Sequence, residues 1–206
     1  MGFPVVLFDL DGTLVDSAAA ILGSFHHATE TVLSRRFPDD QILAQVGGTN
    51  LAHQMQLLDP ERVDELVRAY REHNDPQYSE LACFDGIVAV LEQLKAEHRR
   101  LGVVTAKRRP TVERVFAGAG IGDFFDVVVG SDDTERHKPH PEPVLKALEL
   151  LDARPLDAAY VGDSPFDIAA ARAAGVFAVA VGWGGIHRVK DADAVVGTPG
   201  ELLGVL

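Results

Sequence analysis

Short apolar runs alternate with helical patterns along most of the chain. The first run covers residues 4–8 and stops at Asp9, with Gly12 close behind it. Continuous runs of this kind predict strands that are buried on both faces, and strands that alternate with helices predict βαβ units. The pattern therefore predicts an α/β fold with a doubly wound parallel sheet. The other expected strands cover residues 101–105, 125–129, 158–162 and 176–181, and the expected helices cover residues 87–98, 111–119, 142–151 and 166–174.

A long segment after the first run breaks this rhythm, because it contains no convincing strand. Asp16 or Ser17 can cap a first helix, and further helical patterns start near Asp39 and near Asn50. Pro60 suits the first position of a fourth helix. We therefore expect a small, all-helical cap that is inserted into the α/β core. The expected boundaries place residues 16–80 in the cap and residues 1–15 and 81–206 in the core.

Composition limits the class of protein. The 206 residues are 47% hydrophobic and 24% charged, which is typical of a globular chain with a core. The net charge of −12 disfavours nucleic acids and anionic membranes, which are bound by clustered Lys and Arg. No apolar stretch approaches the about 20 residues of a membrane span, and the N-terminus lacks a secretion signal. We expect a cytoplasmic protein that binds neither nucleic acid nor membrane; these properties leave its oligomeric state open.

Two carboxylates follow the first expected strand. Asp9 and Asp11 flank Leu10 at the carboxyl end of that strand, the edge where ligands bind in open α/β sheets. Carboxylates this close repel each other, so a proton or a cation is needed to hold both. One carboxylate can attack phosphorus, and the other can protonate the leaving oxygen and later activate water. The alternative is a strand-ending turn rich in Asp and Gly, where Gly12 allows the backbone to turn sharply.

Three other junctions after expected strands carry polar side chains. Thr105 follows the second strand, where its hydroxyl can donate to a phosphoryl oxygen or serve structure alone. Lys138 lies in a proline-rich segment before a helix, where it can neutralise carboxylates, although most single lysines are solvated. Asp163 and Asp167 flank a further helix start. A capping box with Ser164 explains Asp167 without a metal, but it does not explain why Asp163 leaves a buried strand into a group of carboxylates.

These stretches together resemble the haloacid dehalogenase superfamily of phosphatases. The four matching segments are residues 9–14 (DLDGTL), residues 105–106, residues 138–141 (KPHP) and residues 162–167 (GDSPFD). The resemblance implies that Asp9 is the nucleophile and Asp11 the general acid/base, with Thr105 and Lys138 at the phosphoryl group. It also implies a Mg²⁺ ion bound by the Asp9 side chain, the Asp11 carbonyl and the Asp163 side chain, with Asp167 supporting these ligands. Ala106 departs from the Asn or Gly often found there, which matters little if only its N–H is used.

Substrate choice is expected to depend on the cap. His26 or its neighbour could meet an anionic substrate, or either could be an ordinary residue on a helix face. Gly48 could let the backbone reach the substrate, or it could belong to a plain turn. A closer resemblance, carried by residues 24–27, 70–74, 139–144 and 181–183, is to the phosphoglycolate phosphatase group and its pyrophosphatase branch. It implies a small phosphorylated metabolite as the substrate, such as phosphoglycolate, with inorganic pyrophosphate as the alternative.

Two rivals deserve comparison with this hypothesis. A haloalkanoate dehalogenase of the same superfamily needs no acid at Asp11 and no metal set, so the presence of Asp11, Asp163 and Asp167 argues against it. A non-enzymatic receiver-type signalling module also combines acidic residues, a Thr and a Lys on a doubly wound sheet. Its acceptor Asp lies on a middle strand of the sequence and it has no helical insertion, whereas here the Asp pair closes the first strand.

Overall fold

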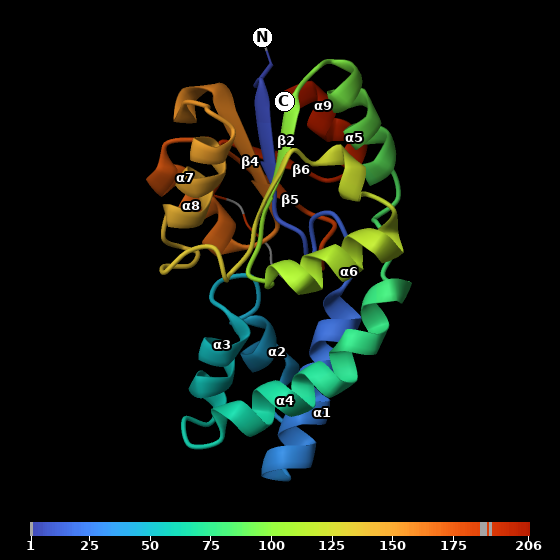
Figure 1. Cartoon of the computed structure of the whole chain (residues 1–206), viewed down its shortest axis with the longest axis vertical. Helices are drawn as coiled ribbons and strands as arrows, with labels where there is room; N and C mark the ends of the chain where they lie inside the picture. The colour runs from blue at the N-terminus through green and yellow to red at the C-terminus, as the bar shows by residue number, and fades with distance from the viewer. Residues whose placement is uncertain (1, 186–188, 190) are drawn as a thin grey trace.

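A computed structural model describes residues 2–185, 189 and 191–206 of the chain. Its centre is a parallel sheet of six strands in the order β3-β2-β1-β4-β5-β6 (Figure 1). Strand β1 pairs with β2 on one side and with β4 on the other, so the first strand of the sequence lies inside the sheet. The strands are β1 (Val5–Phe8), β2 (Arg100–Val104), β3 (Val127–Val129), β4 (Ala158–Gly162), β5 (Phe177–Val181) and β6 (Ala194–Val196).

Helices cover both faces of the sheet. Successive side chains of a strand point to opposite faces, and β1 shows this directly: Val6 and Phe8 pack with one set of helices, while Val5 and Leu7 pack with the other. The first set is α5 (Ile87–Ala96), α6 (Arg109–Ala119) and α9 (Leu202–Val205), and the second is α7 (Glu142–Leu150) and α8 (Pro165–Ala174). The predicted doubly wound α/β fold is thereby confirmed. Short 3₁₀ turns cover Gly122–Phe124, Pro155–Asp157 and Pro199–Glu201.

The inserted segment is helical, as predicted, and lies at one end of the sheet (Figure 1). It has an apolar cluster of its own, in which Phe25 and Tyr70 meet edge to face with ring centroids 5.0 Å apart. This contact joins the first and the last of its α-helices. The division of the chain at residues 15 and 81 stays a prediction. The helices are α1 (Ala18–Leu33), α2 (Asp39–Leu43), α3 (Leu51–Leu58) and α4 (Val63–Asn74), followed by the 3₁₀ helix η1 (Asp75–Glu80).

Some local features differ from the prediction. Pro60 does not begin a helix, because α4 starts only at Val63, after a turn. Ser17 does occupy the N-cap position of α1, but its hydroxyl makes no capping bond and instead donates to Asp11. Strand β6 was not predicted, since a three-residue strand at the edge of a sheet carries too little apolar pattern to be seen in the sequence.

The apolar cluster of the cap should carry its stability. Leu66 is completely buried in this cluster, whereas Leu57 is 57% exposed. We expect Leu66→Ala to lower the free energy of unfolding by about 2–5 kcal/mol, because it removes buried methyl groups and leaves a cavity. The matched control Leu57→Ala should cost about 0.5 kcal/mol or less. Urea unfolding followed by circular dichroism measures both, and equal effects would contradict the packing described here.

Candidate active site

Three neighbouring strands bring the predicted residues to one edge of the sheet. Asp9 follows β1, Thr105 follows β2 and Asp163 follows β4, and the parallel pairing keeps these strand ends level. The ladder extends into the site, because the backbone N–H of Asp9 donates to the Val161 carbonyl at 2.8 Å. The position of each side chain is thus set by the rigid sheet rather than by a loop.

A group of buried carboxylates forms the floor of the site. Asp9, Asp163 and Asp167 are each no more than 2% exposed, and each offers an oxygen that lies within 4.8 Å of the others. Lys138 is equally buried, with its Nζ 3.0 Å from Asp9 Oδ1 and 2.6 Å from Asp167 Oδ1. One lysine cannot balance three carboxylates, so this group lacks positive charge unless protons or a cation supply it.

The pKa values of the carboxyl groups reflect this lack of positive charge. Burial raises the pKa of Asp9 to about 7, against the opposing attraction of Lys138. Burial also raises the pKa of Asp163, to about 9, and the charges of Asp167 and Asp9 add to the effect. Burial alone would lower the pKa of Lys138, but the carboxylates of Asp167 and Asp9 outweigh it and raise that pKa. Lys138 therefore stays charged, while Asp9 and Asp163 are protonated more readily than ordinary carboxyl groups.

One carboxylate oxygen is left without a partner. Asp163 Oδ2 is buried and accepts no hydrogen bond, which is costly for a polar atom withdrawn from water. Gly12, at φ +73°, lies directly against it, and a β-carbon at this position would overlap the Asp163 carboxylate. Carboxylate and carbonyl oxygens are the ligands that Mg²⁺ prefers. The residues at this point therefore fit a small, hard divalent cation.

Asp167 is held differently from its neighbours. The predicted capping box is present: the Ser164 hydroxyl accepts from the Asp167 N–H, and Asp167 Oδ2 accepts from the Ser164 N–H at 3.0 Å. Asp167 Oδ1 lies 2.6 Å from Lys138 Nζ and 3.0 Å from the Tyr160 hydroxyl. Both oxygens of Asp167 are thus engaged within the protein, so this residue can orient Lys138 and support the cluster without binding an ion itself.

Asp11 faces a second basic residue. Its Oδ1 accepts a hydrogen bond of 2.6 Å from the Ser17 hydroxyl, and its Oδ2 lies 3.1 Å from Lys107 Nζ. Burial alone would lower the pKa of Lys107, but the charge of Asp11, the nearby Tyr78 and Tyr70 and the hydrogen bond to Asp11 together raise that pKa. The sequence interpretation missed Lys107, although a basic residue two positions after Thr105 was a usable signal.

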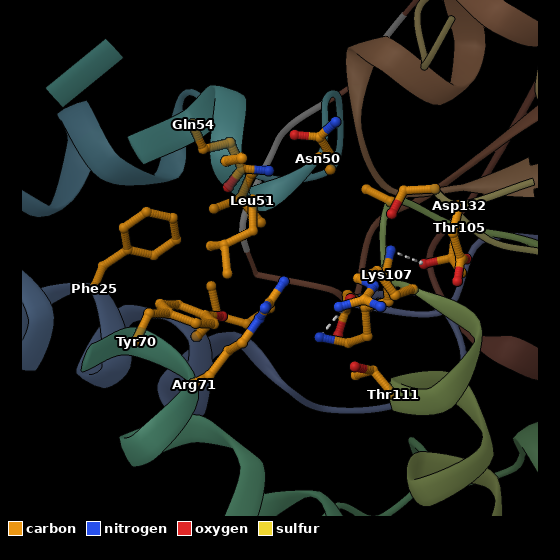
Figure 2. Close-up of a pocket in the computed structure, with 18 of the residues that line it drawn as sticks. Phe25, Asn50, Leu51, Gln54, Tyr70, Arg71, Thr105, Lys107, Thr111 and Asp132 are labelled. Atoms are coloured by element: carbon orange, nitrogen blue, oxygen red, sulfur yellow. Dashed lines mark hydrogen bonds and ion pairs between the residues drawn. The ribbon is translucent and has the colours of Figure 1, made fainter. Parts of the chain in front are cut away.

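A partly open cavity of about 350 Å³ lies between the cap and this edge of the sheet, and Figure 2 shows the side chains around it. This volume is at the small end of the range for ligand sites in proteins. Lys107 lies on the core side, where its N–H donates to Thr105 Oγ1 at 3.3 Å. Residues from both layers line the space, among them Asp9, Asp11, Phe25, Gly47, Leu51, Tyr70, Arg71, Thr105, Ala106, Lys107 and Arg108.

The predicted site residues divide into two groups. Asp9, Asp11, Thr105 and Ala106 line the cavity, and Lys138, Asp163 and Asp167 lie in the buried cluster around Asp9. The two residues predicted from the cap do not line it. His26 is 5% exposed and directs Nε2 to Asp39 Oδ1 at 2.8 Å, and Gly48 packs against the ring of Phe166. The structure brings Gly47 to the cavity in place of Gly48.

Comparison with known proteins agrees with this fold. The sequence model of the haloacid dehalogenase-like hydrolases matches residues 6–181, and the chain belongs to this family. It is 39% identical over 184 residues to pyrophosphatase PpaX of Bacillus cereus (strain G9842), which covers 89% of this chain and 85% of that protein. Membership of a hydrolase family argues against the receiver-type alternative. No helix in the described part of the chain is long and apolar enough to cross a membrane.

Solved structures place the chain among the same hydrolases. A Lactobacillus plantarum protein described as a phosphoglycolate phosphatase superimposes with a TM-score of 0.88 at 27% identity, covering 100% of both chains. A haloacid dehalogenase-like hydrolase from Bacteroides fragilis superimposes with a TM-score of 0.87 at 28% identity, covering 97% of this chain and 99% of that one. The chain is accordingly a phosphatase of the haloacid dehalogenase family.

The carboxylate cluster predicts how stability depends on pH. In EDTA, the folded protein should hold more protons than the unfolded chain between the ordinary pKa of 3.8 and the raised values of about 7 and 9 at Asp9 and Asp163. Stability falls with rising pH wherever the folded state binds more protons, so the melting temperature in EDTA should fall across this window. Thermal melts at a series of pH values measure this slope.

The variant Asp163→Asn isolates the contribution of one carboxyl group to this slope. It removes a buried acid with a raised pKa, so its melting temperature in EDTA should fall less with pH than that of the wild type, and added MgCl₂ should raise it less. The control Glu113→Gln removes an exposed carboxylate and should follow the wild type. Identical slopes for Asp163→Asn and wild type would contradict the conclusion that Asp163 lies in a carboxylate cluster with too little positive charge.

Proposed function

We propose that the protein is a Mg²⁺-dependent phosphatase that cleaves a small phosphorylated metabolite through an aspartyl phosphate on Asp9. One observation carries the proposal: the unpartnered, buried oxygen of Asp163 lies in a carboxylate cluster with Asp9, which itself lines the cavity under the cap. If it bound no ion and processed no anionic substrate, the cluster would have mutual repulsion between its carboxylates and no function to offset that cost. Family membership supports the same chemistry.

The ion would be held by the side chains of Asp9 and Asp163 together with the backbone carbonyl of Asp11. Asp167 would orient the cluster through its bonds to Lys138 and Ser164. When bound, Mg²⁺ neutralises the carboxylates and the phosphoryl oxygens, which lets two anionic partners approach each other. The protonation of Asp9 and Asp163 described above means that ion binding has to displace protons.

The side chains of this chain divide the chemical work. Asp9 attacks phosphorus, and the leaving oxygen departs on the opposite side. Lys138, 3.0 Å from Asp9, stabilises the charge on the transferring group. The Thr105 hydroxyl and the N–H of Ala106 donate hydrogen bonds to its oxygens. Asp11 protonates the leaving oxygen and then takes a proton from the water that releases phosphate from Asp9.

The cavity and the relatives limit the substrate. A volume of about 350 Å³ under the cap admits a small molecule rather than a macromolecule. Its cap side is largely apolar, with Phe25 and Leu51 among the lining residues, which favours a substrate that contains carbon, such as phosphoglycolate. Inorganic pyrophosphate is the second candidate, because the 39% identical relative is named a pyrophosphatase.

The nucleophile assignment predicts a large loss of activity. Asp9→Asn keeps the size of the side chain but removes its nucleophilic charge, so the hydrolysis of p-nitrophenyl phosphate with Mg²⁺ should fall by at least about a thousandfold. EDTA should abolish the wild-type activity. The exposed control Asp40→Asn should retain it. Wild-type turnover by Asp9→Asn, in a protein with an unchanged far-UV spectrum, would exclude Asp9 as the nucleophile.

A panel of phosphate esters and pyrophosphate, ranked by kcat/KM at a fixed Mg²⁺ concentration, tests the substrate proposal. We expect phosphoglycolate and pyrophosphate to rank above p-nitrophenyl phosphate, because a cavity of about 350 Å³ favours small substrates. A preference for bulky or polymeric phosphates would contradict the role assigned to the cap.

A further inference from the structure

Some basic side chains near the cavity are paired with carboxylates of the protein, and others are not. Lys138 is committed to Asp9 and Asp167, and Lys107 is committed to Asp11. Among the described residues, no ion pair or hydrogen bond engages the side chain of Arg71 or that of Arg108, although both residues line the cavity. Arg108 is exposed and solvated, whereas Arg71 is half-buried. Arg71 is therefore the cationic group whose position calls for a ligand.

The helix that carries Arg71 fixes its direction. Tyr70, its neighbour on α4, is 5% exposed and packs against Phe25 in the apolar cluster of the cap. This packing sets the rotation of α4, and Figure 2 shows Arg71 pointing from α4 towards Lys107 across the cavity. Asp75 lies one helical turn further along and also lines the cavity, but its Oδ2 is paired with Arg114 at 2.9 Å. No carboxylate of the cap is thus engaged with Arg71.

The side chain of Arg71 is partly desolvated. A guanidinium that is half withdrawn from water and lacks a carboxylate loses hydration without a compensating bond. Arg also offers a planar fork of donors that matches a carboxylate or a phosphate in a bidentate pair. The reacting phosphoryl group is held on the core side by Asp9 and Lys138, whereas Arg71 reaches in from the cap. An anion at Arg71 is therefore a second anionic group of the same substrate.

We propose that Arg71 binds a second anionic group of the substrate, a carboxylate or a phosphate, and thereby makes the enzyme prefer small phosphates that carry two anionic groups. This inference rests on the proposed function, because it assumes that the phosphoryl group to be transferred sits at Asp9. Since Arg71 comes from the cap and Asp9 from the core, such a substrate bridges the two layers. Phosphates with a neutral end lack this bridge and bind more weakly.

A matched pair of substrates tests the proposal. Phosphoglycolate and 2-hydroxyethyl phosphate differ in one group, a carboxylate in the first and a neutral alcohol in the second. The wild type should favour phosphoglycolate in kcat/KM. Arg71→Met should reduce this preference by about tenfold or more, mainly through KM, because it removes a charged hydrogen bond. Arg71→Lys should restore part of it.

The control is Arg68→Met, which removes an exposed arginine of the same helix that does not line this cavity and should keep the wild-type preference. Pyrophosphate against methyl phosphate repeats the comparison for a second phosphate. Equal losses on both members of a pair would reduce Arg71 to a structural role and overturn the proposal. An unchanged preference in Arg71→Met, or a wild type that does not distinguish the members of either pair, would overturn it as well.

A binding experiment separates this proposal from the proposed function. Phosphonoacetate and ethylphosphonate are matched non-hydrolysable probes with and without a carboxylate, and calorimetry measures their affinities with MgCl₂ present. The wild type should bind phosphonoacetate more tightly, and Arg71→Met should bind the two alike. If the wild type hydrolyses no phosphate but shows this difference, the proposed function fails and the Arg71 site stands. If it hydrolyses phosphates but binds both probes equally, the Arg71 site fails alone.

Discussion

Three buried carboxylates lie beside one lysine at the edge of the sheet, and they repel one another. Much of the structure around them depends on how this repulsion is offset. Asp9, Asp163 and Asp167 are withdrawn from water, where ionised groups are costly unless they are paired. Lys138 offsets part of the charge, and raised pKa values at Asp9 and Asp163 express the rest. The residues here therefore fit a bound cation, and the unpaired oxygens lower the stability of the fold in the absence of one.

The sheet makes this arrangement possible. Strand β1 lies between β2 and β4, so residues that are about a hundred and fifty positions apart in sequence finish side by side at the same edge. Close approach then needs a missing side chain: Gly12 leaves room for the Asp163 carboxylate, and a methyl group there would overlap it. Asp167 completes the cluster from the first turn of α8, where the capping box with Ser164 holds it in place. Rigid backbone rather than loop flexibility thus controls the geometry of the reacting groups.

The cap supplies what the core lacks. The core side of the cavity is charged and polar, while the cap contributes an apolar wall and Arg71. Relatives named for different substrates match this chain over most of its length, and we propose that discrimination between substrates depends on the few side chains that reach the cavity from the cap. The physical basis for such discrimination is the difference between a satisfied and an unsatisfied guanidinium.

The order of elements and the place of the acids at the edge of the sheet were readable from the residues alone, since buried parallel strands are continuous apolar runs and Asp9 and Asp163 directly follow them. Contacts between distant segments were not readable. Lys107 carried no prediction, yet the fold places it against Asp11; His26, a candidate substrate contact in the sequence, directs its ring to Asp39 within the cap. Which face of a cap helix meets the cavity depends on how its apolar cluster packs, and no local pattern encodes that rotation.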